Sequence, residues 1–286
     1  MDPQPNAVTE PSDRAEAASD APPEHGMSAG TTGWTPSMPD QRTLRAEMWL
    51  VLWISIAAAA LRSILSLVNS LTSGVSLSNQ STTLVGTYVP DRQWLDVLYQ
   101  VAHISLALVP VLLVLHLLRR SGEGRQGIGL DLRDWKRDLL KGAALAAVLG
   151  GIGLGFYLLA YHLGMSVRIA AVEANREWWT PILLVASASY NAILEEVIVL
   201  AYFIHRAAQL GWRPWQQVGG SALMRGAYHL YQGFGGFIGN IAMGTVFALL
   251  YRKWGRVMPF LYAHLFIDAG AFLGYYYLGG HISWLP

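Results

Sequence analysis

The stretch 191–202, "NAILEEVIVLAY", sets two adjacent carboxylates, Glu195 and Glu196, in the middle of an apolar run long enough to cross a membrane. A charged side chain at the centre of a bilayer costs ~2.5–3.5 kcal/mol in insertion experiments, so such groups usually face a protein interior or a water-filled cavity. The pair therefore favours a functional site inside a membrane-embedded bundle over a purely structural ion pair.

The composition is typical of a membrane protein. Hydrophobic residues make up 53% of the 286 residues and charged residues only 14%, and the mean hydropathy is +0.32. A single soluble core of this size does not enclose so much apolar surface. The formal net charge of +1 provides no basic excess for nucleic acid, and the absence of cysteine excludes disulfides and cysteine catalysis. We predict an all-α, polytopic transmembrane helical bundle that contacts the lipid bilayer and binds no nucleic acid.

The chain divides into a polar tail and an apolar domain. Residues 1–42 are rich in Pro, Ala, Ser, Asp and Glu, so they cannot bury enough surface to fold and are predicted to be a disordered tail. Residues 43–286 are predicted to form the transmembrane domain with about seven spans. Apolar segments lie near 47–71, 95–118, 139–163, 180–204, 215–232, 234–251 and 257–279. Only "GFGG" at 233–236 separates the fifth and sixth, so 215–251 could be two spans or one kinked helix.

Basic residues in the connections predict the orientation. They gather before the first span and in alternate connections: Arg42, Arg45, Arg119, Arg120, Arg125, Arg133, Lys136, Arg137, Lys141, Arg206, Arg213, Arg252, Lys253 and Arg256. The other connections hold only Arg92, Arg168 and Arg176. The positive-inside rule predicts a plasma-membrane protein with its N-terminus in the cytoplasm and its C-terminus outside. The segment 129–142, "GLDLRDWKRDLLKG", is predicted to be an amphipathic stretch on the cytoplasmic surface.

Three of the predicted spans carry acidic or imidazole groups at similar depth. At 1.5 Å per helical residue, Glu195, His229 and the pair His264 and Asp268 all fall between the cytoplasmic half and the midplane of the bilayer. Each span shows polar residues four apart, which share a helix face: Asn191 with Glu195, Arg225 with His229, and His264 with Asp268. We therefore expect these groups to converge.

The adjacent glutamates are expected to do different jobs. Neighbouring side chains on a helix point about 100° apart, so one of Glu195 and Glu196 can face a cavity while the other braces a neighbouring helix. The candidate catalytic residues are thus Glu195, Glu196, His229, His264 and Asp268, supported by Arg225 and Asn191.

Two kinds of hydrolytic chemistry suit these groups. Glu195, His229 and His264 could hold a divalent metal ion, for which Zn²⁺ is the best candidate, with one position left for an activated water. A buried glutamate could instead be the general base for that water, with His229 or His264 stabilising the oxyanion. The zincin motif H-E-x-x-H is absent from the sequence, as is a Gly-x-Ser-Gly nucleophile with a later histidine.

Three segments resemble a known family. "EEVIVLAYFIHRAAQLGW", "SALMRGAYHLYQGFGGFIGN" and "PFLYAHLFIDAGAF" are similar to the membrane-embedded CPBP family, which includes CAAX prenyl endopeptidases and bacteriocin-processing enzymes. The resemblance covers a core of about residues 178–275. It implies an intramembrane metalloprotease that hydrolyses peptide bonds with a glutamate- and histidine-activated water. The implied substrate is a peptide or membrane protein, prenylated or leader-bearing.

Two positions depart from the family pattern. The family often has Arg four residues after the second glutamate, where this chain has Leu200, and Phe four residues before the histidine, where it has Arg225. Because Arg225 lies one turn from His229, we predict that it pairs with the glutamates in place of the missing arginine.

Two other classes of function remain open. A proton-coupled transporter would also place Glu, His, Asp and Arg at mid-membrane depth, although the sequence contains no inverted repeat. A non-catalytic membrane immunity or scaffold protein would keep much of the same pattern.

Overall fold

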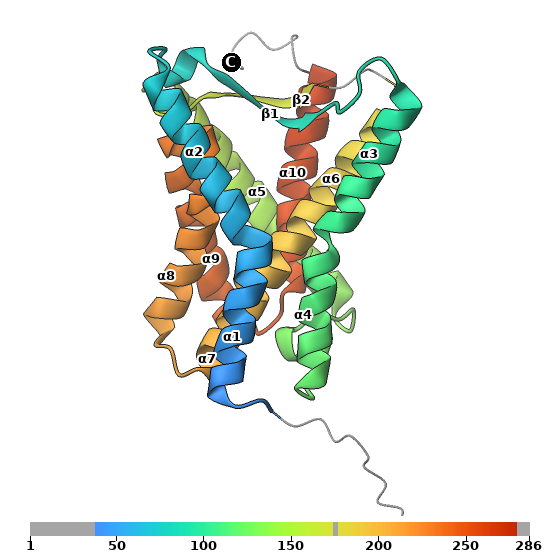
Figure 1. The fold of residues 1–286 in the computed structure, drawn as a ribbon, viewed down its shortest axis with the longest axis vertical. Coiled ribbons are helices and arrows are strands. Elements are labelled where there is room, and N and C mark those ends of the chain that lie inside the picture. The colour runs from blue at the N-terminus through green and yellow to red at the C-terminus, as the bar shows by residue number, and fades with distance from the viewer. Residues whose placement is uncertain (1–37, 174–176, 279–286) are drawn as a thin grey trace, which may run out of the picture. The chain divides into compact units, whose positions relative to one another are not determined.

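The computed structural model describes residues 38–173 and 177–278, and the elements below belong to that part of the chain (Figure 1). Most of the predicted tail, residues 1–37, lies outside the described residues, as do 279–286 at the predicted outer end. The helices are α1 Gln41–Leu52, α2 Ala58–Thr72, α3 Gln93–Ala107, α4 Val109–Arg120, α5 Trp135–His162, α6 Thr180–Glu195, α7 Phe203–Gln209, α8 Pro214–Ala227, α9 Phe234–Trp254 and α10 Met258–Leu278.

Some of these helices run on into one another. The π-helical segment η1 (Trp53–Ala57) joins α1 to α2, and η4 (Glu196–Tyr202) joins α6 to α7. Five continuous stretches are long and apolar enough to cross a membrane: Gln41–Thr72, Gln93–Arg120, Trp135–His162, Thr180–Gln209 and Phe234–Trp254. Helix α10 is as long as α9, at 21 residues, whereas α8 has only 14. The predicted all-α transmembrane bundle is confirmed. Of the about seven spans predicted, five are found by length and composition among the described residues, and α8 is shorter than the ~20 residues of a full span.

The "GFGG" stretch is a reversal. Helix α8 ends at Ala227, the short 3₁₀ helix η5 (Leu230–Gln232) follows, and α9 begins at Phe234. Gly233 has φ +91°, which favours glycine, and a Cβ there would lie 2.6 Å from the carbonyl oxygen of Met165. Helices α8 and α9 then pack side by side (Figure 1), so 214–254 is two helices and not one kinked helix.

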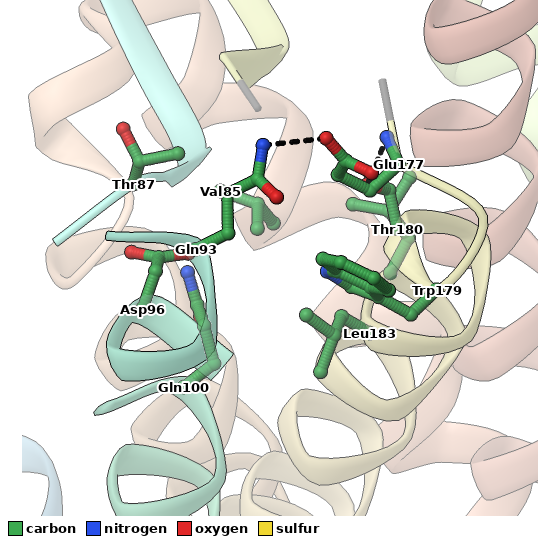
Figure 2. Close-up of a pocket in the computed structure, with 10 residues that line it drawn as sticks. Val85, Thr87, Gln93, Asp96, Gln100, Glu177, Trp179, Thr180 and Leu183 are labelled. Carbon is green, nitrogen blue, oxygen red and sulfur yellow. Dashed lines mark hydrogen bonds between the residues drawn. The ribbon is translucent and has the colours of Figure 1, made fainter. Parts of the chain in front are cut away.

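Two short strands pair loops that are distant in the sequence. Strand β1 (Ser81–Gly86) follows α2, and β2 (Arg168–Glu173) follows α5; they are parallel, with Ser81 opposite Arg168. Near them, residues of β1, α3 and the start of α6 line a small hollow (Figure 2). Gln93 Nε2 donates to Glu177 Oε1 across it at 2.5 Å. Its volume of about 30 Å³ holds a water or two, so it is too small for a substrate.

The predicted amphipathic stretch is only partly a surface segment. Helix α5 begins at Trp135, so the second half of 129–142 forms the first turns of a membrane-length helix. Asp138 is buried there and accepts a 2.7 Å hydrogen bond from Arg256 Nη2, which also pairs with Asp131 at 3.1 Å. Arg256 thus ties two acidic residues of the segment, Asp131 and Asp138, to the turn before α10.

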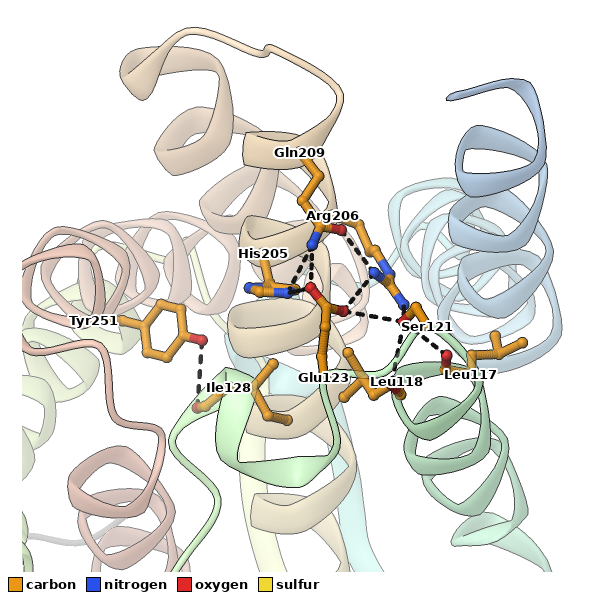
Figure 3. Close-up of polar contacts among 9 residues, drawn as sticks. All are labelled: Leu117, Leu118, Ser121, Glu123, Ile128, His205, Arg206, Gln209 and Tyr251. Atoms are coloured by element: carbon orange, nitrogen blue, oxygen red, sulfur yellow. Dashed lines mark hydrogen bonds and ion pairs between the residues drawn. The ribbon is translucent and has the colours of Figure 1, made fainter. Parts of the chain in front are cut away.

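A second polar cluster fixes the end of α7 (Figure 3). Glu123, in the turn after α4, contacts His205 Nε2 and Arg206 Nη1, both at 2.8 Å. The fully buried Arg206 also donates to Ser121 Oγ at 2.9 Å. Partial burial alone would raise the pKa of Glu123, but the His205 hydrogen bond and the charges of His205 and Arg206 lower it to about 2. The cluster therefore ties the α4 turn to the helix that continues from η4.

Candidate active site

The glutamate pair lies where the helix changes its hydrogen-bonding pattern. Glu195 is the last residue of α6, and Glu196 is the first residue of η4. π-Helical turns are rare in proteins, but those that occur are often located at functional sites. Ser221 Oγ on α8 donates a 2.8 Å hydrogen bond to the Val199 carbonyl oxygen, so α8 satisfies an acceptor within this segment. Every residue of η4 is buried, which places Glu196 in the apolar core and Glu195 directly before it.

Glu196 joins three helices. Its Oε1 accepts a 2.5 Å hydrogen bond from Arg225 Nη2 on α8 and lies 2.7 Å from His264 Nδ1 on α10. Glu196 is fully buried, and Arg225 and His264 are buried with it. The ion pair between Arg225 and the glutamates, which the spacing predicts, is present. Because a carboxylate only accepts, Nδ1 of His264 carries the proton in this contact.

Glu195 has different partners and a different environment. The Tyr228 hydroxyl donates to its Oε2 at 2.7 Å, and Arg225 Nη1 lies 3.4 Å from the same oxygen. The side chain of Glu195 is 12% exposed, whereas that of Glu196 is not exposed. The two glutamates therefore differ as predicted: Glu196 braces neighbouring helices, and Glu195 is accessible.

The two histidines sit differently relative to the pair. His264 Nε2 lies 4.0 Å from Glu195 Oε2 and 3.4 Å from Asp268 Oδ2, so α10 brings both of its predicted residues to the site. His229 follows α8, and its Nδ1 donates to the Arg225 carbonyl oxygen at 2.9 Å. In the neutral ring, Nε2 of His229 is then free to accept a proton.

Of the predicted site residues, Asn191 has the least contact with the others. It lies one turn before Glu195 on α6 and is half-buried. Its side chain makes no hydrogen bond with any residue in the described ranges. Tyr228, by contrast, holds Glu195 but was missed from the sequence, because tyrosines of membrane proteins usually belong to interfacial belts. Its position beside His229 was the available signal.

Close packing of α8 on α9 positions Arg225. A Cβ on Gly244 of α9 would lie 3.1 Å from both Arg225 Cδ and Ala222 Cα, so any larger residue would require these neighbours to move by a few tenths of an ångström. The ring of Phe247 lies 5.4 Å from the Arg225 guanidinium carbon, within cation–π range. Arg225 is therefore held between α9 and the glutamates.

Three of these residues could hold a metal ion. Glu195, Glu196 and His264 each offer one ligand atom, and these atoms lie within 4.8 Å of one another. Glu196 Oε2 is buried and has no hydrogen-bond partner among the described residues, so a lone pair is available. Catalytic Zn²⁺ sites have three protein ligands, and carboxylate oxygen and imidazole nitrogen are among the donors that zinc accepts, so the number and the type of ligands fit. The third ligand is Glu196, whereas the sequence predicts His229.

The bundle holds carboxylates and a buried imidazole side by side, and groups of this kind can activate a water molecule for hydrolysis. Residues 177–270 match a family model described as type II CAAX prenyl endopeptidase Rce1-like. The match contains the glutamate pair, Arg225 and both histidines, and it confirms the resemblance found in the three motifs. It supports an intramembrane endopeptidase, a hydrolase of peptide bonds. No curated protein and no solved structure matches the chain.

Proposed function

We propose that this protein is an intramembrane endopeptidase in which Glu195 activates the attacking water. The observation that carries this proposal is the contrast between the glutamates: Glu196 is occupied by Arg225 and His264, while Glu195 is partly exposed. A residue that must exchange protons with water and substrate needs such access. Asp268 assists by holding His264.

The proton transfers follow from the contacts of Glu195. Tyr228 occupies Oε2, so Oε1 can take a proton from water while the water oxygen bonds to the scissile carbonyl carbon. Glu195 then returns the proton to the leaving amine nitrogen as the C–N bond breaks. Arg225 stabilises the carboxylate charge that this base needs. The free Nε2 of His229 offers a second proton acceptor at the site.

In the alternative route, in which Glu195 is a ligand and not the base, a divalent cation, for which we propose Zn²⁺, would be held by Glu195, Glu196 and His264. When bound, such an ion polarises the scissile carbonyl as a Lewis acid. Elemental analysis of the purified protein should then find zinc at close to one ion per chain, and His264→Ala should lose it while the helical circular dichroism signal is retained. Equal metal content in both proteins would exclude this ligand set.

The substrates proposed are peptides or membrane proteins, prenylated or leader-bearing, which reach the site from the cytoplasmic side of the plasma membrane. The polar segment that precedes α1, which begins at Gln41, would lie in the cytoplasm, and 43–286 would be the catalytic transmembrane domain.

A peptide-library cleavage assay tests the activity. Purified protein in lipid nanodiscs should cut members of the library, and His229→Ala should cut none of them while keeping the thermal stability of the wild type. Proton-driven uptake into proteoliposomes without any peptide cleavage would favour the transporter instead. Full cellular function in variants of Glu195 and His229 would favour the non-catalytic immunity or scaffold protein.

A further inference from the structure

A larger cavity, open to the surface, lies beside Tyr228 on the side of α2. It has a volume of about 290 Å³ and is lined by Ala59, Arg62, Ser63, Ser66, Tyr228 and Tyr231. Tyr228 belongs both to this cavity and to the site, since its hydroxyl donates to Glu195 Oε2. The volume is near the lower end of the ~300–1,000 Å³ of small-molecule sites, so it suits a short piece of peptide.

Arg62 is the charged group in the lining of this cavity. Its side chain is exposed and makes no hydrogen bond or ion pair with any residue that the structure describes. The adjacent Ser63 Oγ accepts a 2.7 Å hydrogen bond from the Tyr231 backbone N–H, which fixes this turn of α2 against η5. An arginine without an acidic partner inside a membrane-length helix is costly and marks a functional position.

The depth of Arg62 argues against a lipid headgroup as its partner. It lies ten residues before Thr72, where α2 ends, which is about 15 Å along the helix axis. The hydrogen bond from Tyr231 to Ser63 holds it near the level of His229, close to the glutamates and away from the ends of the bundle. A ligand carried by the substrate can reach that depth.

We propose that Arg62 binds a carboxylate of the peptide substrate and so selects which peptides are cut. The inference rests on the proposed peptidase function. A guanidinium presents two parallel N–H donors that match a carboxylate, and the hydroxyls of Ser66 and Tyr231 add neutral donors in the same lining. Glu195 would repel an anion placed beside it. A carboxylate on the Arg62 side therefore sets the direction in which the peptide lies across the site.

The test uses a peptide that the purified protein cleaves, prepared in matched forms. One form carries a C-terminal amide in place of the acid, and another carries Asn or Gln in place of each Asp or Glu near the cut. The wild type should prefer the acid in one of these two arms by about tenfold or more in kcat/KM, the size expected for one charged hydrogen bond. The arm that shows the preference identifies the carboxylate as terminal or side-chain.

Arg62→Gln should abolish that preference by raising KM for the acid form, and Arg62→Lys, which keeps the charge, should retain part of it. Arg45→Gln, at an exposed arginine near the start of α1, should leave the preference unchanged. An unaltered preference in Arg62→Gln, or equal losses in the Lys and Gln variants, would contradict the proposal. A loss of cleavage rate that is equal for all peptides and depends only on the content of anionic lipid would also contradict it, because this would indicate that Arg62 binds a lipid phosphate. A wild type that cleaves without preference refutes this inference alone, whereas one that cleaves nothing refutes the function.

Discussion

Glu195 and Glu196 are adjacent in the sequence but have different consequences for stability. Glu196→Gln removes the closest partner of Arg225, which is buried. We expect this change to lower the free energy of unfolding in detergent by about 3–5 kcal/mol, which is typical of buried ion pairs that lose one member. Glu195→Gln should lower the free energy of unfolding by much less, because the Tyr228 hydroxyl can still donate to the amide oxygen. Chemical unfolding followed by circular dichroism measures both. Equal stability of the two variants would mean that Arg225 depends on Glu195 instead.

The sequence predicts the individual site residues better than it predicts their contacts. Glu195 and Glu196 are identified by the high free energy of placing a charged side chain in a bilayer. Arg225, His264 and Asp268 are identified by their helical spacing. Spacing could not identify Tyr228, because a tyrosine hydroxyl gains its meaning from a partner on another helix. Nor could it assign the metal-capable group, since the choice between Glu196 and His229 depends on side-chain directions that no periodicity encodes.

The contact between α8 and α9 depends on Gly244. Gly244→Ala should push the helices apart and displace Arg225, because its Cβ would press on the Ala222 backbone at 3.1 Å. We expect a loss of about 1–3 kcal/mol, typical of overpacking, together with a loss of cleavage. Gly153→Ala on α5 is the matched control, since its Cβ would meet nothing within 4 Å and alanine favours the helix. Equal melting temperatures of Gly244→Ala and Gly153→Ala would show that α8 and α9 are not tightly packed at Gly244.

The turn after α4 should lose its attachment in acid. The pKa of Glu123 is about 2 in the folded protein, whereas the ordinary pKa of a glutamate is 4.5. A lowered folded pKa gives stability that is complete above the unfolded pKa and disappears as pH falls through the folded one. The difference in melting temperature between wild type and Glu123→Gln should therefore be largest near neutral pH and shrink between about pH 5 and pH 2. A difference that does not change with pH would place the stabilising charge elsewhere.

Helices are predictable here because apolar runs of about twenty residues have few alternatives in a membrane. The irregular elements are not. The π-helical segment η4 has the same apolar composition as an α-helix, and its pattern is maintained by contacts such as Ser221 to Val199. Strands β1 and β2 have six residues each and lie 87 positions apart in register, Ser81 with Arg168. Nothing local in either segment specifies its partner.

The topology of the whole chain is an expectation that the positive-inside rule supplies. With seven crossings, an N-terminal tag should be shielded in intact cells and a C-terminal tag accessible to protease. Helix α8 has only 14 residues, so it is the least certain of the seven predicted spans. Tags found on the same side would mean that α8 and α9 enter and leave the bilayer from one face.

The convergence of α6, α8 and α10 on one buried group is what links the fold to hydrolysis. The sequence predicted that these helices carry reactive side chains at a common depth, and the contacts of Glu196 with Arg225 and His264 agree with that. Which helices pack together could not be predicted, because apolar faces in lipid are nearly interchangeable and small residues such as Gly244 decide the contacts.

The most direct measurement is the cleavage rate of Glu195→Gln relative to wild type, with both proteins in the same nanodiscs and of matched melting temperature. If Glu195 is the base that activates water, kcat should fall by about 10²–10⁴-fold, the usual contribution of general base catalysis, while stability stays near that of the wild type. A Glu195→Gln protein that cleaves the same peptides at the wild-type rate would contradict the account.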